Sequence, residues 1–284
     1  MEKIAIVVDS GADISPKLAE EKGMYYLPLY INIEGEFLKD RIDISPEDFY
    51  AYIKRENYLP KTSLPAPGDV ISLIERLKED GYDKVIIICI GSKFSGTYNL
   101  CDMLEVEGIE TYAFDSRNLT LAEGFLAFYA KKLIDEGRTF DQVKEGLENI
   151  RTNSRVFFTI ESFKYIVEGG RVPKTFGKIS DAISVKPLIT VDPEEGKFKL
   201  VKLVRGEKKI FKQFYKLALE NLEGAKNYYM FIAHGDSQDM AAKLEETLRD
   251  IIEGASLFIK DQISPTLGAN TGPGLVGFGF LKID

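Results

Sequence analysis

The stretch Val85-Ile86-Ile87-Ile88-Cys89-Ile90, with the segment that follows it, Gly91-Ser92-Lys93-Phe94-Ser95-Gly96-Thr97-Tyr98, decides the fold expected for this chain. Six apolar residues without alternation are typical of a strand that helices cover on both faces of a parallel sheet. The glycines and hydroxyls after it indicate a turn into a helix. In open α/β sheets, ligands bind beyond the carboxyl ends of the strands, where this turn lies.

Two other stretches in the first half follow the same pattern. Residues 4–8 form an apolar run that ends in Asp9-Ser10, and residues 109–114 form a third strand that ends in Asp115-Ser116. Ser15-Pro16 and Ser45-Pro46 are helix starts, and amphipathic helices are expected around residues 70–77 and 121–133. Strands that alternate with helices predict a parallel α/β sheet.

The pattern changes after Thr139-Phe140-Asp141-Gln142, a capping box that begins one more helix. Strands are expected at residues 155–160, 185–191, 197–204, 228–233 and 256–259, with a glycine-broken strand over 275–283. A short helix ends at Gly169-Gly170, and two long helices lie around 211–222 and 240–251. We therefore predict an α/β fold of two domains. Residues 1–150 form an α/β/α parallel-sheet domain, and residues 151–284 form a mixed sheet with helices on one face.

Composition excludes several partners. The 284 residues carry a net charge of −8, and the pI is about 5.1, so nucleic acid and anionic membrane surfaces are unsuitable main partners. No apolar run approaches the ~18 residues of a membrane helix. The amino terminus enters a strand directly, which predicts no signal peptide, and Cys89 and Cys101 are expected to be reduced thiols. These features predict a cytoplasmic protein.

Three hydroxyl- and glycine-rich segments, expected to be loops, are the candidate binding elements. They contain Thr62 and Ser63, then Ser95 and Gly96, then Asn270 and Thr271. Hydroxyls, amides and free backbone N–H groups are suited to an oxyanion, above all at the amino terminus of a helix. The alternatives stay open: Ser95 as a plain helix cap, and Thr62-Ser63 as a plain turn before proline. With so much apolar sequence elsewhere, the segments predict a site for an anionic head group and an apolar tail.

Motifs for catalysis are absent or unsuitable. Residues 272–277 match G-x-G-x-x-G, but the chain ends seven residues later, so no dinucleotide site is expected. The sequence has no Walker A motif and no nucleophile elbow. The sole histidine, His234, is interpreted as structural. Asp9, Asp13 and Asp115 are more typical of turn caps than of a metal site. We expect no catalytic residue, metal or cofactor; a small-molecule kinase or hydrolase on a related two-domain scaffold is the alternative.

At these residues the sequence resembles the DegV family of bacterial fatty-acid-binding proteins over essentially its whole length. The matching motifs are Asp9-Ser10, Thr62-Ser63-x-Pro-x-Pro, Ser92-x-x-Ser95-Gly96-Thr97-Tyr98, Asp115-Ser116, Glu168-Gly169-Gly170-Arg171 and Thr271-Gly272-Pro273-Gly274. The resemblance implies two domains that clasp one long-chain fatty acid such as palmitate. Thr62 and Ser95 would hold its carboxylate, and the tail would lie in the carboxyl-terminal domain.

The resemblance also implies a partner. Some members of the family are the lipid-presenting subunit of a fatty acid kinase, in which a separate ATP-binding protein phosphorylates the carboxylate. Arg171 and Arg205 are the positions implied for that coupling, with a domain-interface salt bridge as the alternative for Arg171. One departure is Asn270, where relatives commonly carry histidine. Asparagine donates a hydrogen bond but carries no charge, which favours head-group binding over charge-assisted coupling.

Overall fold

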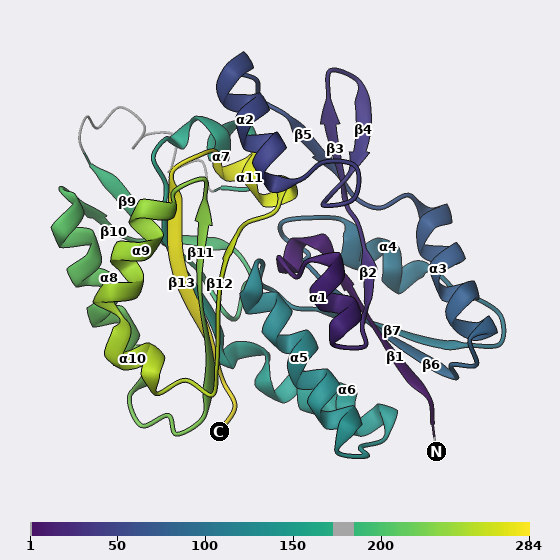
Figure 1. The fold of residues 1–284 in the computed structure, drawn as a ribbon. Helices are drawn as coiled ribbons and strands as arrows, with labels where there is room; N and C mark the ends of the chain where they lie inside the picture. The colour runs from purple at the N-terminus through teal and green to yellow at the C-terminus, as the bar shows by residue number, and fades with distance from the viewer. Residues whose placement is uncertain (1, 173–184) are drawn as a thin grey trace.

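The first half of the chain forms a four-stranded parallel sheet in the order β2 (Tyr25–Leu27), β1 (Ile4–Asp9), β6 (Lys84–Cys89) and β7 (Glu110–Asp115) (Figure 1). The computed structural model describes residues 2–172 and 185–284. Every residue of β1 is buried, and so is every residue of β6 after Lys84. This confirms the strands that their apolar runs predicted.

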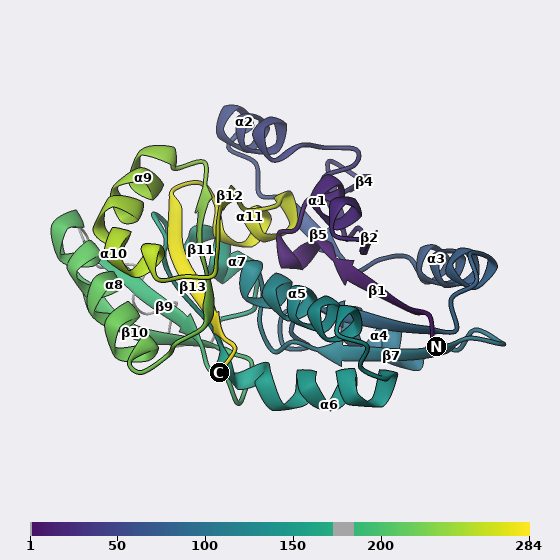
Figure 2. The same cartoon turned by 60° about the horizontal axis from the view of Figure 1, so that its bottom comes forward.

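Helices cover both faces of this sheet (Figure 2). On one face, α3 (Pro67–Glu79) and α4 (Thr97–Met103) enclose an apolar cluster that contains Val7, Ile87 and Cys101. On the other face lie α1 (Pro16–Glu21), α5 (Leu121–Asp135) and α6 (Phe140–Ile150). The expected starts of α1 and α2 (Pro46–Glu56) at serine caps are confirmed, and so is the capping box of Thr139 and Gln142. Capping side chains therefore set where these three helices begin.

The second half forms a six-stranded mixed sheet in the order β10-β9-β8-β13-β11-β12. Its strands are β8 (Ser154–Thr159), β9 (Lys186–Val191), β10 (Phe198–Val204), β11 (Tyr228–Gly235), β12 (Leu257–Gln262) and β13 (Leu275–Lys282). Among the described strands of this sheet, only β11 and β12 pair in parallel. One face is covered by α8 (Glu207–Leu222), α9 (Gln238–Thr247) and α10 (Arg249–Glu253).

The opposite face of this large sheet packs on α5, which also contacts β1 and β6. One apolar cluster therefore extends from Ile6 and Ile88 through Phe125 to Phe231 and Leu275. The domain boundary expected at residue 150 falls at the end of α6, before the 3₁₀ turn η2 (Arg151–Asn153) and β8. Both sides of this boundary contribute to the same core.

A third sheet, not predicted from the sequence, joins β4 (Glu36–Lys39), β3 (Tyr30–Ile33) and β5 (Lys61–Ser63) in antiparallel pairs. Two short helices of the second half lie beside each other, α7 (Phe163–Glu168) and α11 (Pro265–Thr271). The helix α11 also contacts α2, β3, β5 and the 3₁₀ turn η1 (Ser10–Ala12). A segment close to the carboxyl terminus is thereby inserted against the amino-terminal half.

Four expectations are corrected. Thr62 and Ser63 lie in strand β5 rather than in a loop, because their backbone pairs with β3. Asn270 and Thr271 end α11, whose start is capped by Ser264. The helix expected around 240–251 is two helices that meet at Leu248.

The fourth correction concerns β13, which is not broken by its glycines but is continuous and central in the sheet. A methyl group at Gly279 would lie 2.3 Å from the carbonyl oxygen of Arg155, so the glycines admit a close neighbouring strand. The strand expected over 185–191 is confirmed as β9. Among the described helices, none combines the length and apolarity needed to cross a membrane.

Candidate ligand-binding cavity

A cavity with about 1020 Å³ of empty space, counted to its open mouth, lies where β5, the β6–α4 turn, α11 and the large sheet meet. Its wall has a polar part and an apolar part. The polar part contains all six head-group residues expected from the sequence, together with Arg171: Thr62, Ser63, Ser95, Gly96, Asn270 and Thr271.

Thr62 and Ser63 reach the cavity from β5, which pairs with the central strand β3 of the small sheet, Thr62 opposite Ile31. Both residues are partly buried. A hydroxyl on a strand is held more firmly than one on a free loop, because ladder hydrogen bonds fix the backbone. The small sheet therefore positions these two hydroxyls. Because this sheet was not predicted, the sequence did not explain why they lie there.

Ser95 and Gly96 lie at the turn into α4, as the sequence predicted. The Ser95 hydroxyl lies 2.8 Å from that of Thr97 and accepts a hydrogen bond of 3.3 Å from the Thr97 backbone N–H. Gly96 is the residue before the first turn of α4. Ser95 thus serves the local turn and also lines the cavity, whereas the helix cap is Gly96, so the interpretation of Ser95 as a plain helix cap is wrong.

Asn270 and Thr271 differ in the hydrogen bonds that they can still donate to a ligand. The Thr271 hydroxyl donates to the carbonyl of Leu267 at 2.9 Å, which occupies its only proton. The Asn270 side-chain amide donates one hydrogen bond to the carbonyl of Thr266 at 3.1 Å and has a second N–H. Asn270 is therefore the better donor of the pair toward a ligand.

The Glu168-Gly169-Gly170-Arg171 motif packs directly on the end of α11. A methyl group at Gly169 would lie 2.5 Å from the Asn270 amide oxygen, and one at Gly272 would lie 2.3 Å from the Tyr165 ring. Arg171 lines the cavity and donates to the carbonyls of Phe94, at 3.3 Å, and Gly169. Two motifs about 100 residues apart in the sequence thus form one end of the site.

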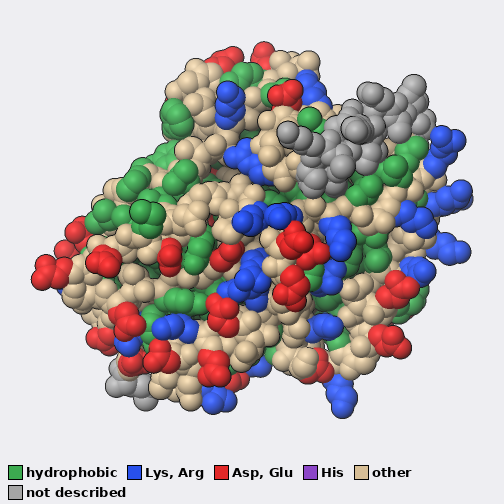
Figure 3. Space-filling model, turned by 180° about the vertical axis from the view of Figure 1, so that it is seen from behind, with side chains coloured by type: hydrophobic (Ala, Val, Ile, Leu, Met, Phe, Trp, Pro, Cys, Tyr) green, Lys and Arg blue, Asp and Glu red, His purple; other side chains and the backbone are tan. Residues whose placement is uncertain are grey.

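Arg205 lies elsewhere. It borders a shallow groove on β10 and α8 together with Lys202, Lys209 and Lys212. Basic side chains project from this edge of the molecule when it is seen from behind (Figure 3). In the described part of the chain, Arg171 is brought to the cavity and Arg205 is not.

The apolar part of the wall draws on both halves of the chain. Phe94 and Phe198 contact each other with ring centroids 4.6 Å apart, and Phe158 packs edge-on against Phe198 at 5.6 Å. The sequence did not identify which of the 18 phenylalanines line a cavity. The pairing of strands that are distant in the sequence decides which phenylalanines line the cavity. The remaining large apolar side chains of the wall are Leu29, Leu64, Ile90, Leu119, Val156, Phe231, Ile263, Leu267 and Leu275.

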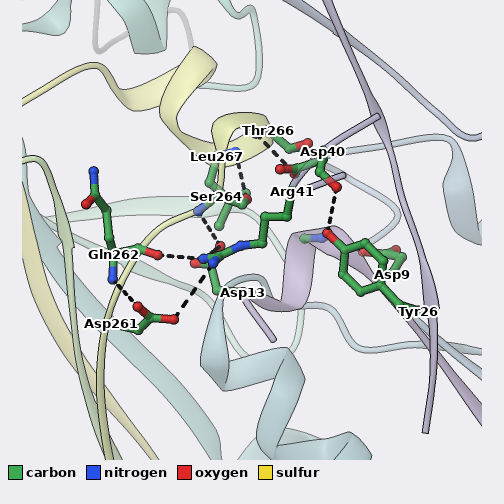
Figure 4. Close-up of polar contacts among 11 residues, drawn as sticks. Asp9, Asp13, Tyr26, Asp40, Arg41, Asp261, Gln262, Ser264, Thr266 and Leu267 are labelled. Atoms are coloured by element: carbon green, nitrogen blue, oxygen red, sulfur yellow. Dashed lines mark hydrogen bonds and ion pairs between the residues drawn. The ribbon is translucent and has the colours of Figure 1, made fainter. Parts of the chain in front are cut away.

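A buried network of charged groups anchors the start of α11 beside the cavity (Figure 4). Arg41 donates to the carbonyl of Gln262 at 2.6 Å and lies 4.0 Å from Asp13 and 3.8 Å from Asp261. Asp13 accepts from the backbone N–H of Ser264 at 2.7 Å. In the same way, Asp40 accepts from the N–H of Thr266 at 3.2 Å. Two carboxyls of the amino-terminal half thus bind the free N–H groups at the beginning of this helix.

Burial changes the acidity of this network. Loss of hydration raises the pKa of Asp13 to about 7, against the opposing effect of the Arg41 guanidinium. Burial likewise raises the pKa of Asp9 to about 7, although the backbone N–H groups of Ile90 and Gly11 bind its carboxyl. It raises the pKa of Glu123 well above its usual value, and neighbouring Asp9 adds to the shift. No sequence pattern indicated that Asp40, Arg41 and Glu123 belong together.

The described residues contain no group of three His, Cys, Asp or Glu side chains that could hold a metal ion. Asp9 caps η1 by accepting from Gly11, and Asp115 accepts from the N–H groups of Ser92 and Arg117, which confirms the interpretation as turn caps for these two residues. For Asp13 the interpretation is wrong, because its carboxyl pairs with Arg41 and accepts from the distant Ser264 N–H. The ring nitrogen Nδ1 of buried His234 accepts from the Ser237 N–H at 3.4 Å. Burial lowers the pKa of His234, which fits a structural role. Cys89 and Cys101 are buried free thiols.

The fold and the cavity define a class: an α/β protein that combines a parallel and a mixed sheet around one mostly apolar site. The sequence profile of the DegV family of uncharacterised proteins matches residues 3–282, and the chain belongs to this family. A DegV domain-containing protein of Clostridium acetobutylicum is 34% identical over 99% of this chain and 100% of its own length.

Solved structures share the fold. DegV from Bacillus subtilis, described as a fatty acid binding protein, superposes with a TM-score of 0.91 at 27% identity, over 99% of this chain and 100% of that one. A DegV family protein from Thermus thermophilus, solved for its fatty acid binding, gives a TM-score of 0.90 at 25% identity, over 99% of both chains. The family and fold expected from the motifs are thereby confirmed.

Proposed function

We propose that this protein binds one long-chain fatty acid in the cavity, between the halves formed by residues 1–150 and 151–284. The carboxylate would lie against Thr62, Ser63, Ser95, Gly96 and Asn270, with Thr271 shaping the same end. One observation carries the proposal: hydroxyl and amide donors from three distant segments line a cavity whose other lining side chains are mainly apolar. Fatty acid binding by two solved relatives supports it.

The energetics agree with this ligand. A tail of about 14 methylenes contributes on the order of 11 kcal/mol gross when it is buried, at about 0.8 kcal/mol each. Association costs several kcal/mol or more, so the tail supplies most of the affinity. The carboxylate must be hydrogen-bonded, because burial of a bare charge is very costly. The donors therefore set the orientation of the ligand, and the apolar wall sets the affinity.

We further propose that the protein acts in the cytoplasm as a carrier without chemistry of its own and presents the carboxylate to a separate ATP-dependent kinase. Arg171 supports this role because it lies at the polar end of the cavity, and a guanidinium suits phosphate oxygens. Arg205 would act there only as part of a contact surface with the partner, since it borders a different groove. A small-molecule kinase or hydrolase remains the alternative function.

Native mass spectrometry of the purified protein tests the binding proposal. The expected result is one long-chain acyl ligand per chain, with palmitate or oleate taken up by delipidated protein. A protein that is always empty and rejects both acids would contradict the proposal.

The carrier role has a separate test. Loaded protein is incubated with ATP and Mg²⁺, with and without a candidate kinase subunit, and acyl phosphate is trapped with hydroxylamine. Product only with the partner, lost in Arg171→Ala while lipid stays bound, is expected. Turnover by the isolated chain would instead support the enzyme alternative.

A further inference from the structure

Two threonines that the sequence did not single out line the same cavity. Thr120 immediately precedes α5, and Thr266 lies in the first turn of α11. Each residue is only 3% exposed. Neither hydroxyl has a hydrogen-bond partner of acceptable geometry among the described residues. Buried hydroxyls are almost always satisfied, so two such groups on one cavity wall require an explanation.

A carboxyl lies beside each hydroxyl. Thr120 is close enough to Asp13, and Thr266 to Asp40, to lower the pKa of that carboxyl by hydrogen bonding. Each carboxyl also has one buried oxygen without a partner, Oδ2 of Asp13 and Oδ1 of Asp40. If each hydroxyl gives its proton to the neighbouring carboxyl, it has no proton left for a ligand. Its oxygen would then keep lone pairs that can accept a further proton donor.

The backbone of Thr120 gives independent support. Its φ of 55° and ψ of −158° lie in a region that β-branched residues rarely adopt, and its N–H is held by the carbonyl of Gly11 at 2.7 Å. Strained residues of this kind persist where the surrounding structure fixes them, and they gather at ligand sites. The hydrogen bond to Gly11 fixes the backbone that carries this side chain at the wall of the cavity.

The surrounding charges decide what could bind there. Asp9, Asp13, Asp40 and Glu123 are buried behind this wall, and Arg41 pairs with Asp13 and lies close to Asp40. Because Arg41 is already engaged by Asp13 and Asp261, it is not available to hold a carboxylate at this wall. A neutral group that donates a proton would be stabilised, and a plain methylene would leave the acceptors unsatisfied.

We propose that Thr120 and Thr266 form a second polar position in the cavity, which binds a hydroxyl group carried on the acyl chain of the ligand. The inference rests on the proposed function, because it needs an acyl chain in the cavity. The ligand class is a long-chain hydroxy fatty acid. Its carboxylate stays at the Thr62 and Ser95 end, and its hydroxyl donates to a threonine oxygen.

Competition binding with stearic acid and its 3-, 10- and 12-hydroxy derivatives tests the proposal. The affinity of each acid is measured on delipidated protein by displacement of a fluorescent fatty acid. In the wild type, at least one hydroxy isomer is expected to bind as tightly as stearic acid, because only one chain position can reach the threonines. In Thr120→Val and Thr266→Val, the affinity of that isomer relative to stearic acid should fall by about 5- to 10-fold. Thr120→Ser, which keeps the hydroxyl, should retain the preference.

The outcomes separate this proposal from the proposed function. Stearic acid binding with every hydroxy isomer at least tenfold weaker in the wild type would overturn the second position alone. A preference that persists in both valine variants would also overturn it. If neither stearic acid nor any isomer binds, both proposals fail together.

Discussion

The polar end of the cavity and the Arg41 network are built by the same two parts of the chain, but they handle polarity in opposite ways. Each joins the amino-terminal half to α11. In the network, carboxyls meet a guanidinium and backbone N–H groups, so these polar groups bind one another inside the protein. At the cavity, Thr62, Ser95 and Asn270 are partly buried and line open space.

The difference shows how the short helix α11 serves two purposes. Its amino-terminal end is fixed by Asp13 and Asp40, and its carboxyl-terminal end presents Asn270 to the cavity. Fixing a helix at one end orients the residues at the other, because seven residues span only about two turns. Substitutions in the network should therefore change stability first, and substitutions at the cavity should change binding alone.

The largest effect is expected for Arg41→Met. Its side chain is 8% exposed, and its loss would leave the buried carboxyls Asp13 and Asp40 without a counter-charge. Removal of one partner from a buried ion pair typically costs about 3–5 kcal/mol. We expect the free energy of unfolding, measured by urea titration, to fall by about 3 kcal/mol. Arg205→Met is the matched control on the exposed surface, with an expected change within about 0.5 kcal/mol. Equal effects in both would contradict the anchoring role.

The second effect concerns pH. Burial raises the pKa of Asp9 and of Asp13 to about 7 in the folded protein, above the ordinary value of 3.8. The folded state therefore binds more protons than the unfolded state between these values, and the unfolding free energy should fall as pH rises from about 4 to 7. Glu123, whose pKa is also raised, acts in the same direction. His234, whose pKa is lowered by burial, acts in the opposite direction below its usual 6.5.

Urea unfolding at several pH values between 5 and 8 measures this slope. Asp9→Asn removes one titrating group with little change of size, so its stability should vary less steeply with pH than that of the wild type. Parallel profiles for the two proteins would show that Asp9 titrates at its ordinary pKa.

At the cavity, Thr62→Val and Ser95→Ala each remove a hydroxyl. If each leaves a bound carboxylate without one donor, fatty acid affinity should weaken by about 1–3 kcal/mol. The unfolding free energy of the empty protein should change little, in contrast to Arg41→Met. Isothermal titration with palmitate measures the affinity. Unchanged binding in both variants would show that Thr62 and Ser95 serve only the strand and the helix turn in which they lie.

The smallest effect is expected for Gly169→Ala. The added methyl group would lie 2.5 Å from the Asn270 amide oxygen and would displace that side chain. We expect a loss of palmitate affinity of about 1 kcal/mol, the value of one hydrogen bond. Gly68→Ala is the control, because nothing lies within 4 Å of a methyl group there. Equal affinities of the two variants would indicate that Asn270 does not contact the ligand.

Much of the fold could be predicted because its signals are local. Continuous apolar runs identified β1 and β6, and serine, threonine and proline at helix starts identified α1, α2 and α6. The small sheet escaped because β3, β4 and β5 have only three or four residues each. Strands so short have no reliable periodicity, and the pairing partner of β5 lies about 30 residues away.

The sequence by itself determined the α/β class, the capped helices and the three segments that carry donor groups, because these depend on neighbours within a few residues. The tertiary structure alone decided that Thr62 lies on a strand, that Arg171 and not Arg205 reaches the cavity, and which phenylalanines form its wall. It also decided that Asp13, Asp40 and Arg41 meet the start of α11, more than 200 residues further along the chain. Contacts at such separation depend on how sheets and helices pack, and no local pattern of residue types encodes them.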